Sequence, residues 1–441
     1  MEYITNIAFA LVLMVGIVFF ARNVKKLIRN IRLGKEVVAN DNKPQRWKNM
    51  ARIALGQSKM VVRPIPGILH ILVYLGFVII NLEVLEIVLD GLLGTHRLFA
   101  GLGVFYNVLI ASFEILAFLV IVSVVVFWIR RNIVRVKRFM SPEMKGWPKN
   151  DGNMILYIET VLMSLFLTMN ATDFQLQQLG AAHYVEAGSF PISQFLVPLF
   201  EGMSVQALII IERSAWWLHI VGILFFLNYL YYSKHLHILL AFPNTYFGRV
   251  GPKGKFRNLD AVTQEVKLMM DPDADPYAEP AGDADEPSKF GASDVMDLSR
   301  VQLLNAYTCT ECGRCTSECP ANLTGKKLSP RKIMMDTRDR LEEVGKNIDA
   351  NKGSFADDGK QLLDDYITRE ELWACTSCNA CTEACPVSID PLSIIMDMRQ
   401  YLVMEQSAAP SDLNNMMGNI ENNGAPWPFN QMDRLNWKDE A

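Results

Sequence analysis

The sequence predicts an all-α protein in which a five-helix transmembrane bundle precedes a cytoplasmic α-helical domain. Three observations predict it: long apolar runs in the first half, an uneven distribution of charge, and eight cysteines confined to the second half. Residues 1–240 contain 22 Lys and Arg and 14 Asp and Glu, a net charge of +8, whereas residues 241–441 contain 21 and 33, a net charge of −12. These features argue against a purely soluble, secreted or nucleic-acid-binding protein.

Five apolar segments are each about 20 residues long, enough to cross a bilayer as a helix. They cover residues 3–21, 67–90, 102–128, 153–172 and 214–238. The first has no basic region before it and no small-residue cleavage pattern after it, so we expect a retained anchor. Residues 191–211 are nearly long enough to span. Because Pro191, Pro198 and Glu201 interrupt them, we favour an interfacial or re-entrant segment.

The charges of the loops predict the orientation. Residues 22–63 contain twelve Lys and Arg, and residues 130–149 contain seven. The loops on the other side of the bundle contain almost none apart from Arg97 and Arg213. Because cytoplasmic loops carry an excess of Lys and Arg, we expect a multi-pass protein of the inner (cytoplasmic) membrane, with its N-terminus outside and its second half in the cytoplasm.

Histidines in the predicted spans are candidate haem ligands. His219 and His237 are 18 residues apart, five full turns of one helix, so both would face the same way about 27 Å apart. His70 lies at the depth of His237, and neutral imidazole is a good axial ligand for haem iron. We therefore expect a His70–His237 pair to bind one b-type haem near the cytoplasmic face. His235 projects in another direction and is the poorer candidate.

A second haem at His219 would need a partner on the second helix. The sequence has Ile80 and Asn81 at the matching depth, and the loop histidines His96 and His183 are the remaining substitutes. One haem is therefore favoured over two. Taken singly, each of these histidines could also be an ordinary polar residue at the membrane interface.

Residues 1–245 resemble the gamma subunit of respiratory nitrate reductase and the membrane cytochrome b subunit of heterodisulfide reductases. The resemblance rests on the five spans, on His70, His219 and His237, and on the segment KHLHILLAFP. In that family two histidines on helix two pair with two on helix five. The resemblance implies a cytochrome b-like bundle that binds haem and exchanges electrons with quinone. The fourth histidine is absent here, so the resemblance does not extend to the second haem.

Acidic residues inside the spans are further candidates, because they are costly in a membrane and usually functional. Glu83, Glu86 and Asp90 form a stripe toward the outer end of the second helix, and Glu114 and Glu159 lie on the third and fourth helices. They could form hydrogen bonds between helices, or they could transfer protons at an outer quinone site. The sequence leaves both interpretations open.

Two segments lack the periodicity of a folded domain. Residues 246–300 form the predicted linker, of which residues 271–300 are acidic and rich in Pro, Ala and Gly, as in a flexible tether. Residues 406–441 form a tail that contains Pro, Asn and Trp. This tail is interpreted either as a docking segment for a partner or as plain disorder.

The strongest signal is a repeated cysteine run, CTECGRCTSECP and CTSCNACTEACP. Each follows the bacterial ferredoxin pattern, in which three cysteines ligate one 4Fe–4S cluster and the fourth ligates the other. We assign Cys309, Cys312, Cys315 and Cys385 to cluster 1, and Cys375, Cys378, Cys381 and Cys319 to cluster 2. Disulfides are disfavoured in the cytoplasm, and zinc sites do not repeat a four-cysteine run that ends in proline.

A helix is expected after each run. Ser329-Pro330 and Asp390-Pro391 are typical of helix starts. The segment between Cys319 and Cys375 also has a helical pattern, unlike the short gap of a compact ferredoxin. Residues 301–405 resemble the α-helical ferredoxin domain of the heterodisulfide reductase small iron–sulfur subunit and of succinate dehydrogenase-type iron–sulfur subunits.

These features together predict an electron-transfer subunit. The sequence has no dinucleotide fingerprint, no P-loop and no Cys-Cys-Gly repeat, and the two clusters would use all eight cysteines, so we assign no catalytic residue. Electrons would pass between a cytoplasmic redox partner, two 4Fe–4S clusters, a b-type haem and the quinone pool. The expected partner is a Cys-Cys-Gly-type protein or a flavoprotein, with membrane lipid around the bundle and no nucleic acid. The alternatives are a haem-free cluster–quinone oxidoreductase and a membrane-anchored iron–sulfur redox sensor or scaffold.

Overall fold

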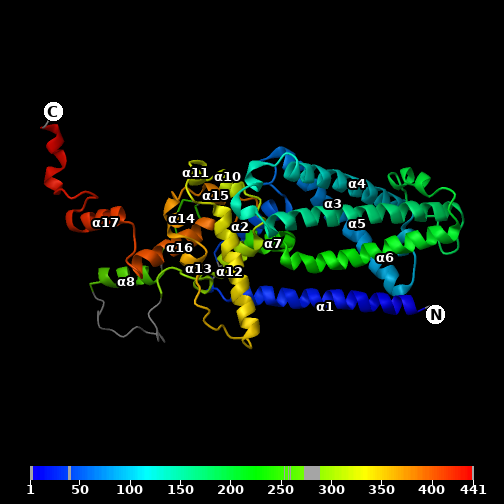
Figure 1. Cartoon of the computed structure of the whole chain (residues 1–441), viewed down its shortest axis with the longest axis horizontal. Helices are drawn as coiled ribbons and strands as arrows, with labels where there is room; N and C mark the ends of the chain where they lie inside the picture. Colours follow the sequence, from blue (N-terminus) through cyan, green and yellow to red (C-terminus); the bar gives the residue numbers. More distant parts are fainter. Residues whose placement is uncertain are drawn as a thin grey trace.

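The computed structural model describes residues 3–37, 41–252, 254–256, 258, 260–272 and 289–439. This part of the chain is all-α and contains no β-strand, only two isolated bridges, Lys35–Ser299 and Leu363–Ile367. Figure 1 shows an elongated molecule in which a bundle of long helices is followed by a domain of shorter helices and then by a projecting C-terminal tail. The predicted fold class is confirmed.

Five helices of the described chain are long and apolar enough to cross a membrane. They are α1 (Ile4–Arg32), α3 (Pro64–Leu93), α4 (Val104–Asn132), α5 (Trp147–Gln178) and α6 (Val205–Tyr229). Glycines allow close approach between them: a Cβ on Gly76 would lie 2.6 Å from Val120, and one on Gly222 would lie 2.7 Å from Leu162. Close packing at small residues is how helices associate in lipid. Each predicted span has its counterpart among these helices.

The fifth span begins earlier than predicted. Helix α6 starts at Val205, so the second part of segment 191–211 belongs to this span. The first part forms two short 3₁₀ turns, Ser193–Phe195 and Val197–Phe200, and does not cross the bundle. The interfacial interpretation stays a prediction for the turns and is wrong for the residues from Val205 onward.

The fifth span also ends earlier than predicted. After α6 come a 3₁₀ turn at Leu230–Tyr232 and a second one at Lys234–Leu236. Between them Ser233 is extended, with φ −111° and ψ 150°, and its side chain accepts a hydrogen bond from the backbone N–H of His235. A serine that caps a new turn in this way competes with continuation of the helix.

A new helix, α7 (His237–Phe247), therefore starts at His237. The prediction that His219 and His237 project from one face of a single helix is wrong, because the helix breaks between them.

The C-terminal domain consists of short helices around two longer ones. They are α9 (Arg300–Thr308), α10 (Arg314–Ser317), α11 (Pro320–Leu323), α12 (Pro330–Ala350), α13 (Leu362–Asp365), α14 (Arg369–Ala374), α15 (Ala380–Ala384) and α16 (Pro391–Met404). The predicted helix starts are confirmed. Ser329 caps α12 by accepting from the N–H of Lys332, and Asp390 caps α16 by accepting from the N–H of Ser393.

The predicted linker is only partly a linker. It contains a helix, α8 (Asp260–Met270), and its residues 273–288 lie outside the described residues. Residues 289–300 are packed into the C-terminal domain, where Ala292, Val295 and Leu298 are fully buried in its apolar core. The packed domain thus includes residues from 289, not from 301. The tail beyond it forms α17 (Ser411–Asn423) and a 3₁₀ turn at Gln431–Lys438.

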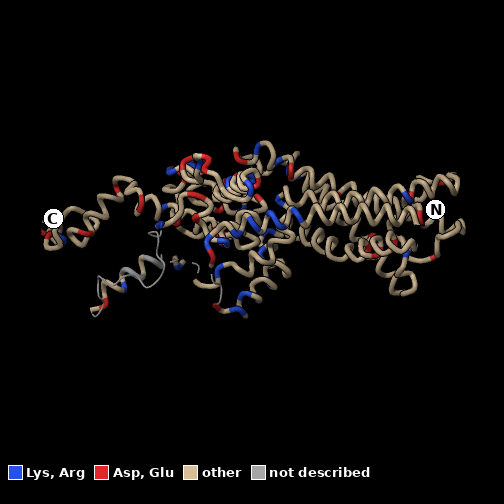
Figure 2. Tube along the Cα trace, turned by 90° about the horizontal axis from the view of Figure 1, so that it is seen from below, with Lys and Arg blue, Asp and Glu red and all other residues tan. Residues whose placement is uncertain are grey.

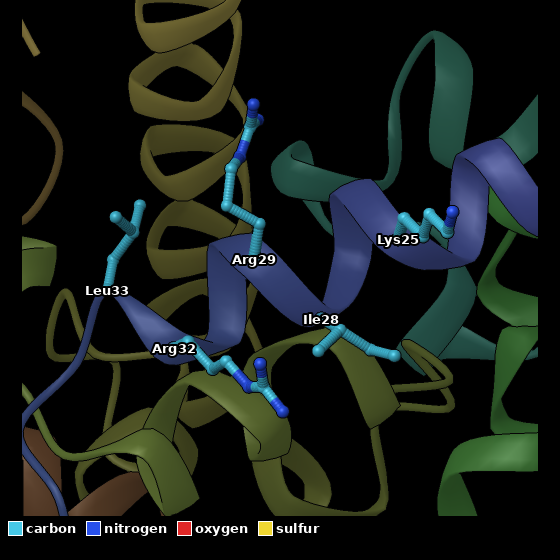
Figure 3. Close-up of a pocket in the computed structure, with 5 residues that line it drawn as sticks. All are labelled: Lys25, Ile28, Arg29, Arg32 and Leu33. Carbon is cyan, nitrogen blue, oxygen red and sulfur yellow. The ribbon is translucent and has the colours of Figure 1, made fainter. Parts of the chain in front are cut away.

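The C-terminal domain is docked directly on one end of the bundle, where Figure 2 shows Lys and Arg concentrated. On α1, Lys26 forms an ion pair with Asp349 of α12 at 2.8 Å, and Asn30 donates to the hydroxyl of Tyr307 at 2.8 Å. Figure 3 shows Arg29, which also pairs with Asp349, extending along α12. The surface groove in this view is lined by Lys25, Ile28, Arg29, Arg32 and Leu33.

The burial of residues 289–300 leads to a stability prediction. Val295→Asp places a charge in the core without a partner, so we expect it to lower the free energy of unfolding by about 3 kcal/mol or more. Val266→Asp is the matched control, because Val266 is 46% exposed on α8 and the same change should have little effect there. Thermal unfolding of both variants in detergent, followed by circular dichroism, measures the difference. Equal melting curves would contradict the packing described above.

Candidate cluster sites and histidine pair

The two cysteine runs have the same local structure. Cys309 and Cys375 each follow the last residue of a helix, α9 and α14. Two residues later, Glu311 and Ser377 have left-handed φ values of 54° and 55°. The residues that start α10 and α15, Gly313 and Asn379, also correspond, with φ values of 70° and 60°. The backbone around the first three cysteines therefore has the same conformation in both runs, and a proline follows the fourth cysteine of each run.

The eight cysteines are free thiols in two neighbouring groups. We call Cys309, Cys312, Cys315 and Cys385 the first set, and Cys319, Cys375, Cys378 and Cys381 the second set. Burial raises the pKa of Cys315, and the nearby thiols of Cys312, Cys309, Cys385 and Cys381 raise it further. Burial likewise raises the pKa of Cys375, and Cys319 and Cys378 add to this. Cys315 is thus near thiols of both sets, and the assignment of each cysteine to one cluster stays a prediction.

A single metal ion and an iron–sulfur cluster need different arrangements of thiols. Within the described residues, no three His, Cys, Asp or Glu side chains converge on a single metal position. Thiolates that bind the separate irons of a cubane need not converge on one point, and iron binding would remove the protons that burial favours. Cys309, Cys319, Cys381 and Cys385 are buried, whereas Cys378 is exposed at the surface.

The first set faces the membrane bundle. The Nζ of Lys59, five residues before α3, donates to the backbone oxygens of Glu383 and Cys385 at 3.3 Å each. In return, Arg314 of α10 donates to the backbone oxygens of Lys59 and Met60 at 3.0 and 3.3 Å. The loop of the first run is thus attached to the segment that leads into α3.

A buried ion-pair network secures the same junction. Lys234, directly after the break of the fifth span, pairs with Glu311 at 2.5 Å, and Arg338 pairs with the other oxygen of Glu311 at 2.8 Å. Burial alone would raise the pKa of Glu311, but the charges of Lys234 and Arg338 outweigh it and lower the pKa. Arg331 forms a second such contact, with Glu143 at 2.6 Å.

The predicted histidine pair is brought together at this end of the bundle. The rings of His70 on α3 and His237 on α7 have centroids 6.3 Å apart, tilted by 39°. Two imidazoles that bind one metal from opposite sides at about 2 Å each have centroids about 6 Å apart. The Nδ1 of His237 lies 3.1 Å from the backbone oxygen of Lys234, which leaves its Nε2 free, and the Nδ1 of His70 is buried without a hydrogen-bond partner. The spacing is what two imidazoles that share one metal would have, and the assignment of a haem to them stays a prediction.

The other histidines do not form such a pair. His219 is buried on α6, with its Nδ1 3.0 Å from the backbone oxygen of Leu162, and the aromatic ring in contact with it within the described chain is Phe166. His235 lies beside His237, at 5.4 Å between centroids. His96 contacts Tyr184 and Asp173 at the opposite end of the bundle, and His183 is exposed. A second pair like His70–His237 is therefore not seen in this part of the chain.

Most of the acidic residues gather at the opposite end of the bundle. Arg97 donates to Asp173 at 2.6 Å and to Tyr106 at 3.1 Å, and Tyr106 donates to Glu86 at 2.9 Å. They surround a cavity of about 30 Å³, enough for a water molecule. Its lining comprises Glu83, Glu86, Ile87, Asp90, Thr95, His96, Arg97, Met169, Asp173, Glu212, Arg213 and Trp216.

The predicted acidic residues have different surroundings there. The buried carboxyl of Glu83 has one oxygen, Oε2, without a hydrogen-bond partner. Glu114 accepts the N–H groups of Ile192 and Ser193 at 2.9 and 3.1 Å, so it holds a loop in place. Glu159 is half-buried on α5 and does not line the cavity.

The sequence patterns did not predict the ion-pair partners at the two ends of the helix bundle. Lys234 and Glu311 lie next to candidate residues, His235 and Cys312, but no local pattern marks a lysine as buried. Arg97 stands out in the sequence as a rare cation in its loop, which is the available signal for its pairing with Asp173.

Comparison with known proteins supports the prediction that the two cysteine runs belong to an iron–sulfur domain. Residues 308–389 match the family model of the 4Fe-4S dicluster domain. The chain is 29% identical to a probable iron-sulfur-binding oxidoreductase, FadF, of Bacillus subtilis (strain 168), over 98% of this chain and 60% of that protein. It is 25% identical to the EtfAB:quinone oxidoreductase of Syntrophomonas wolfei over 92% of this chain and 55% of that protein. The chain thus spans little more than half the length of these two relatives.

A shorter match concerns the C-terminal half. It is 31% identical to one subunit of the ferredoxin/F(420)H(2)-dependent CoB-CoM heterodisulfide reductase of Methanosarcina acetivorans, over 27% of this chain and 60% of that relative. No solved structure matches the chain. The predicted resemblance to heterodisulfide reductase iron–sulfur subunits is confirmed. The chain is similar to iron–sulfur oxidoreductases, and it combines five helices that are long and apolar enough to cross a membrane with a region that matches the 4Fe-4S dicluster domain.

Proposed function

We propose that the protein transfers electrons between a soluble redox partner and quinone in the membrane. One observation carries this proposal: the first cysteine set is docked on the end of the bundle where His70 and His237 face each other at 6.3 Å. Arg314 connects the first cysteine set with the histidine pair, because its charge acts on the thiols of Cys312 and Cys385 and also on His70. A chain of redox groups bound at these residues would connect the domain to the membrane.

The residues present fit the groups that this function needs. The first set would hold one 4Fe–4S cluster, the second set would hold the other, and His70 and His237 would hold a b-type haem. When bound, these groups supply one-electron transfer. The protein holds the first set away from water at the junction, while Cys378 of the second set lies at the surface, where a soluble partner could approach.

The orientation of the bundle in the membrane is inferred from the charges of its loops. We propose that the end of the bundle carrying the C-terminal domain faces the cytoplasm, because its loops contain the excess of Lys and Arg. The tail exposes Trp427, Phe429 and Trp437, and we propose that it contributes to docking of the partner. The quinone oxidoreductase and heterodisulfide reductase relatives support a partner protein and a quinone, which we extend to this chain as part of the proposal.

The cavity at the opposite end supports a role in proton transfer. Reduction of a quinone to a quinol takes up two protons with two electrons, so a protonatable group is needed beside the bound quinone. Glu83 has a free carboxylate oxygen in a cavity that can hold water, beside the charged chain of Arg97 and Asp173. We propose that Glu83 exchanges protons between this cavity and quinone.

Removing one histidine tests the haem assignment. We expect His237→Ala to reduce bound haem from about one per polypeptide to almost none, because one axial ligand is lost, while about eight iron atoms in clusters remain. His70→Ala should have the same effect. Reduced-minus-oxidised spectra with iron and acid-labile sulfide assays on anaerobically purified protein measure both quantities.

The exposed His183 provides the control, since His183→Ala should leave the haem content unchanged. Wild-type protein with full cluster content but no haem, from cells supplied with haem, would contradict the assignment and favour a haem-free oxidoreductase.

A second prediction concerns Glu83. Glu83→Gln keeps the size of the side chain but cannot take up a proton, so we expect quinone-linked turnover to fall about 100-fold. Reduction of the clusters by dithionite should be unaffected. Glu201→Gln, at an exposed position of the loop before α6, is the matched control. Unchanged turnover in Glu83→Gln would rule out this residue as the proton carrier.

A further inference from the structure

The first cysteine set is surrounded by positive charge. Lys59 donates to the backbone oxygen of Cys385 at 3.3 Å, and Arg138 lies against the loop of the first run, where a Cβ on Gly313 would be 3.4 Å from its Cβ. The charges of Arg138 and Arg314 act on the thiol of Cys312, and those of Arg314 and Lys59 act on that of Cys385. Arg338 acts on the thiol of Cys309. The acidic residue that acts on Cys309 is Glu311, and both Lys234 and Arg338 already compensate it through ion pairs. Because Arg338 also pairs with Asp339, the positive charge next to the first set comes from Lys59, Arg138 and Arg314.

The second set has a nearly balanced environment. Arg399 acts on Cys375, and Asp390, of opposite sign, acts on Cys381. The guanidinium of Arg399 donates to the backbone oxygens of Leu372 and Cys375 at 2.6 Å each. Cys378 is exposed to water, which screens charge. The two sets thus have similar backbone loops but differ in their charged neighbours.

Part of the positive charge comes from the bundle. Lys59 precedes α3, and Arg138 belongs to the 3₁₀ turn Lys137–Phe139 that follows α4. Arg138 lies over the ring of Phe139, 4.9 Å from its centroid. Burial, followed by the charge of Arg63, lowers the pKa of Arg138 to about 10, so this side chain is still protonated at neutral pH. The docked arrangement, rather than the domain alone, creates the difference.

We propose that the cations Lys59, Arg138 and Arg314 make the cluster of the first set the more readily reduced one, so that electrons move from the second set toward the bundle. This inference rests on the proposed function. Each step transfers one electron, which oxidises the second cluster and reduces the first, without a proton or a co-reactant. The added negative charge is stabilised by nearby cations in surroundings of low dielectric constant, and net charge and solvent exposure tune the potentials of such clusters.

Arg138 offers the cleanest test. Its carbonyl oxygen accepts a hydrogen bond from Arg331 at 2.6 Å, and that contact survives a change of the side chain. We expect Arg138→Gln to lower the midpoint potential of the higher-potential cluster and to leave the other unchanged. Arg138→Lys, which keeps the charge, should stay close to wild type. The measurement is a redox titration of the full chain in lipid nanodiscs, followed by electron paramagnetic resonance.

Two further variants complete the design. Arg399→Gln should shift the lower-potential cluster, and Lys327→Gln should shift neither, because Lys327 is 73% exposed and pairs with Glu370 on the surface. The inference is overturned if both clusters have the same potential, if Arg138→Gln moves neither cluster, or if it moves the lower-potential one. In these cases the proposed function still stands. Protein that shows no 4Fe–4S signals and binds no iron would overturn the proposed function together with the inference.

Discussion

Docking of the C-terminal domain through buried charges is the constraint on which the other features depend. Lys234, Glu311 and Arg331 are each almost inaccessible to water at the junction. Loss of one partner from such a pair leaves an uncompensated charge and costs about 3–5 kcal/mol. The two parts also share one apolar core, since Leu27 and Leu236 of the bundle pack with the buried residues of the domain. The first cysteine set is therefore held at a fixed place against the bundle.

The break after the fifth span determines both the contact of Lys234 with the cysteine domain and the position of His237 in the bundle. Because Ser233 ends the helix and caps a new turn, Lys234 is directed to Glu311 and His237 is placed opposite His70. A continuous helix would have carried His237 farther along the axis of α6. The same short turn thus sets the contact with the cysteine loop and the spacing of the histidine pair, and neither can be changed without affecting the other.

Local patterns predicted a large part of this arrangement. The lengths of the apolar runs indicated the five spans, and Ser329 and Asp390 marked helix starts that the structure confirms. The break at Ser233 was missed because apolar residues continue on both sides of the polar stretch Ser233-Lys234-His235, so the segment still resembles one helix. The packing of Val295 and the pairing of Lys234 with Glu311 were missed because they depend on contacts between distant segments. The prediction of the His70–His237 pair rested on two arguments. The matched depth of His70 and His237 agrees with the structure, whereas the shared helix face of His219 and His237 does not.

The basic residues of the loops have more than one consequence. In the sequence, Lys59, Arg63 and Arg138 contribute to the excess of positive charge that fixes orientation in a membrane. In the folded protein they lie at the junction, where Arg63 pairs with Glu318 and Lys59 binds the backbone of Cys385. A domain that binds anionic clusters is attracted to such a surface, and its own net negative charge adds to this. The excess of positive charge in these loops therefore favours docking of the cysteine domain on this end of the bundle.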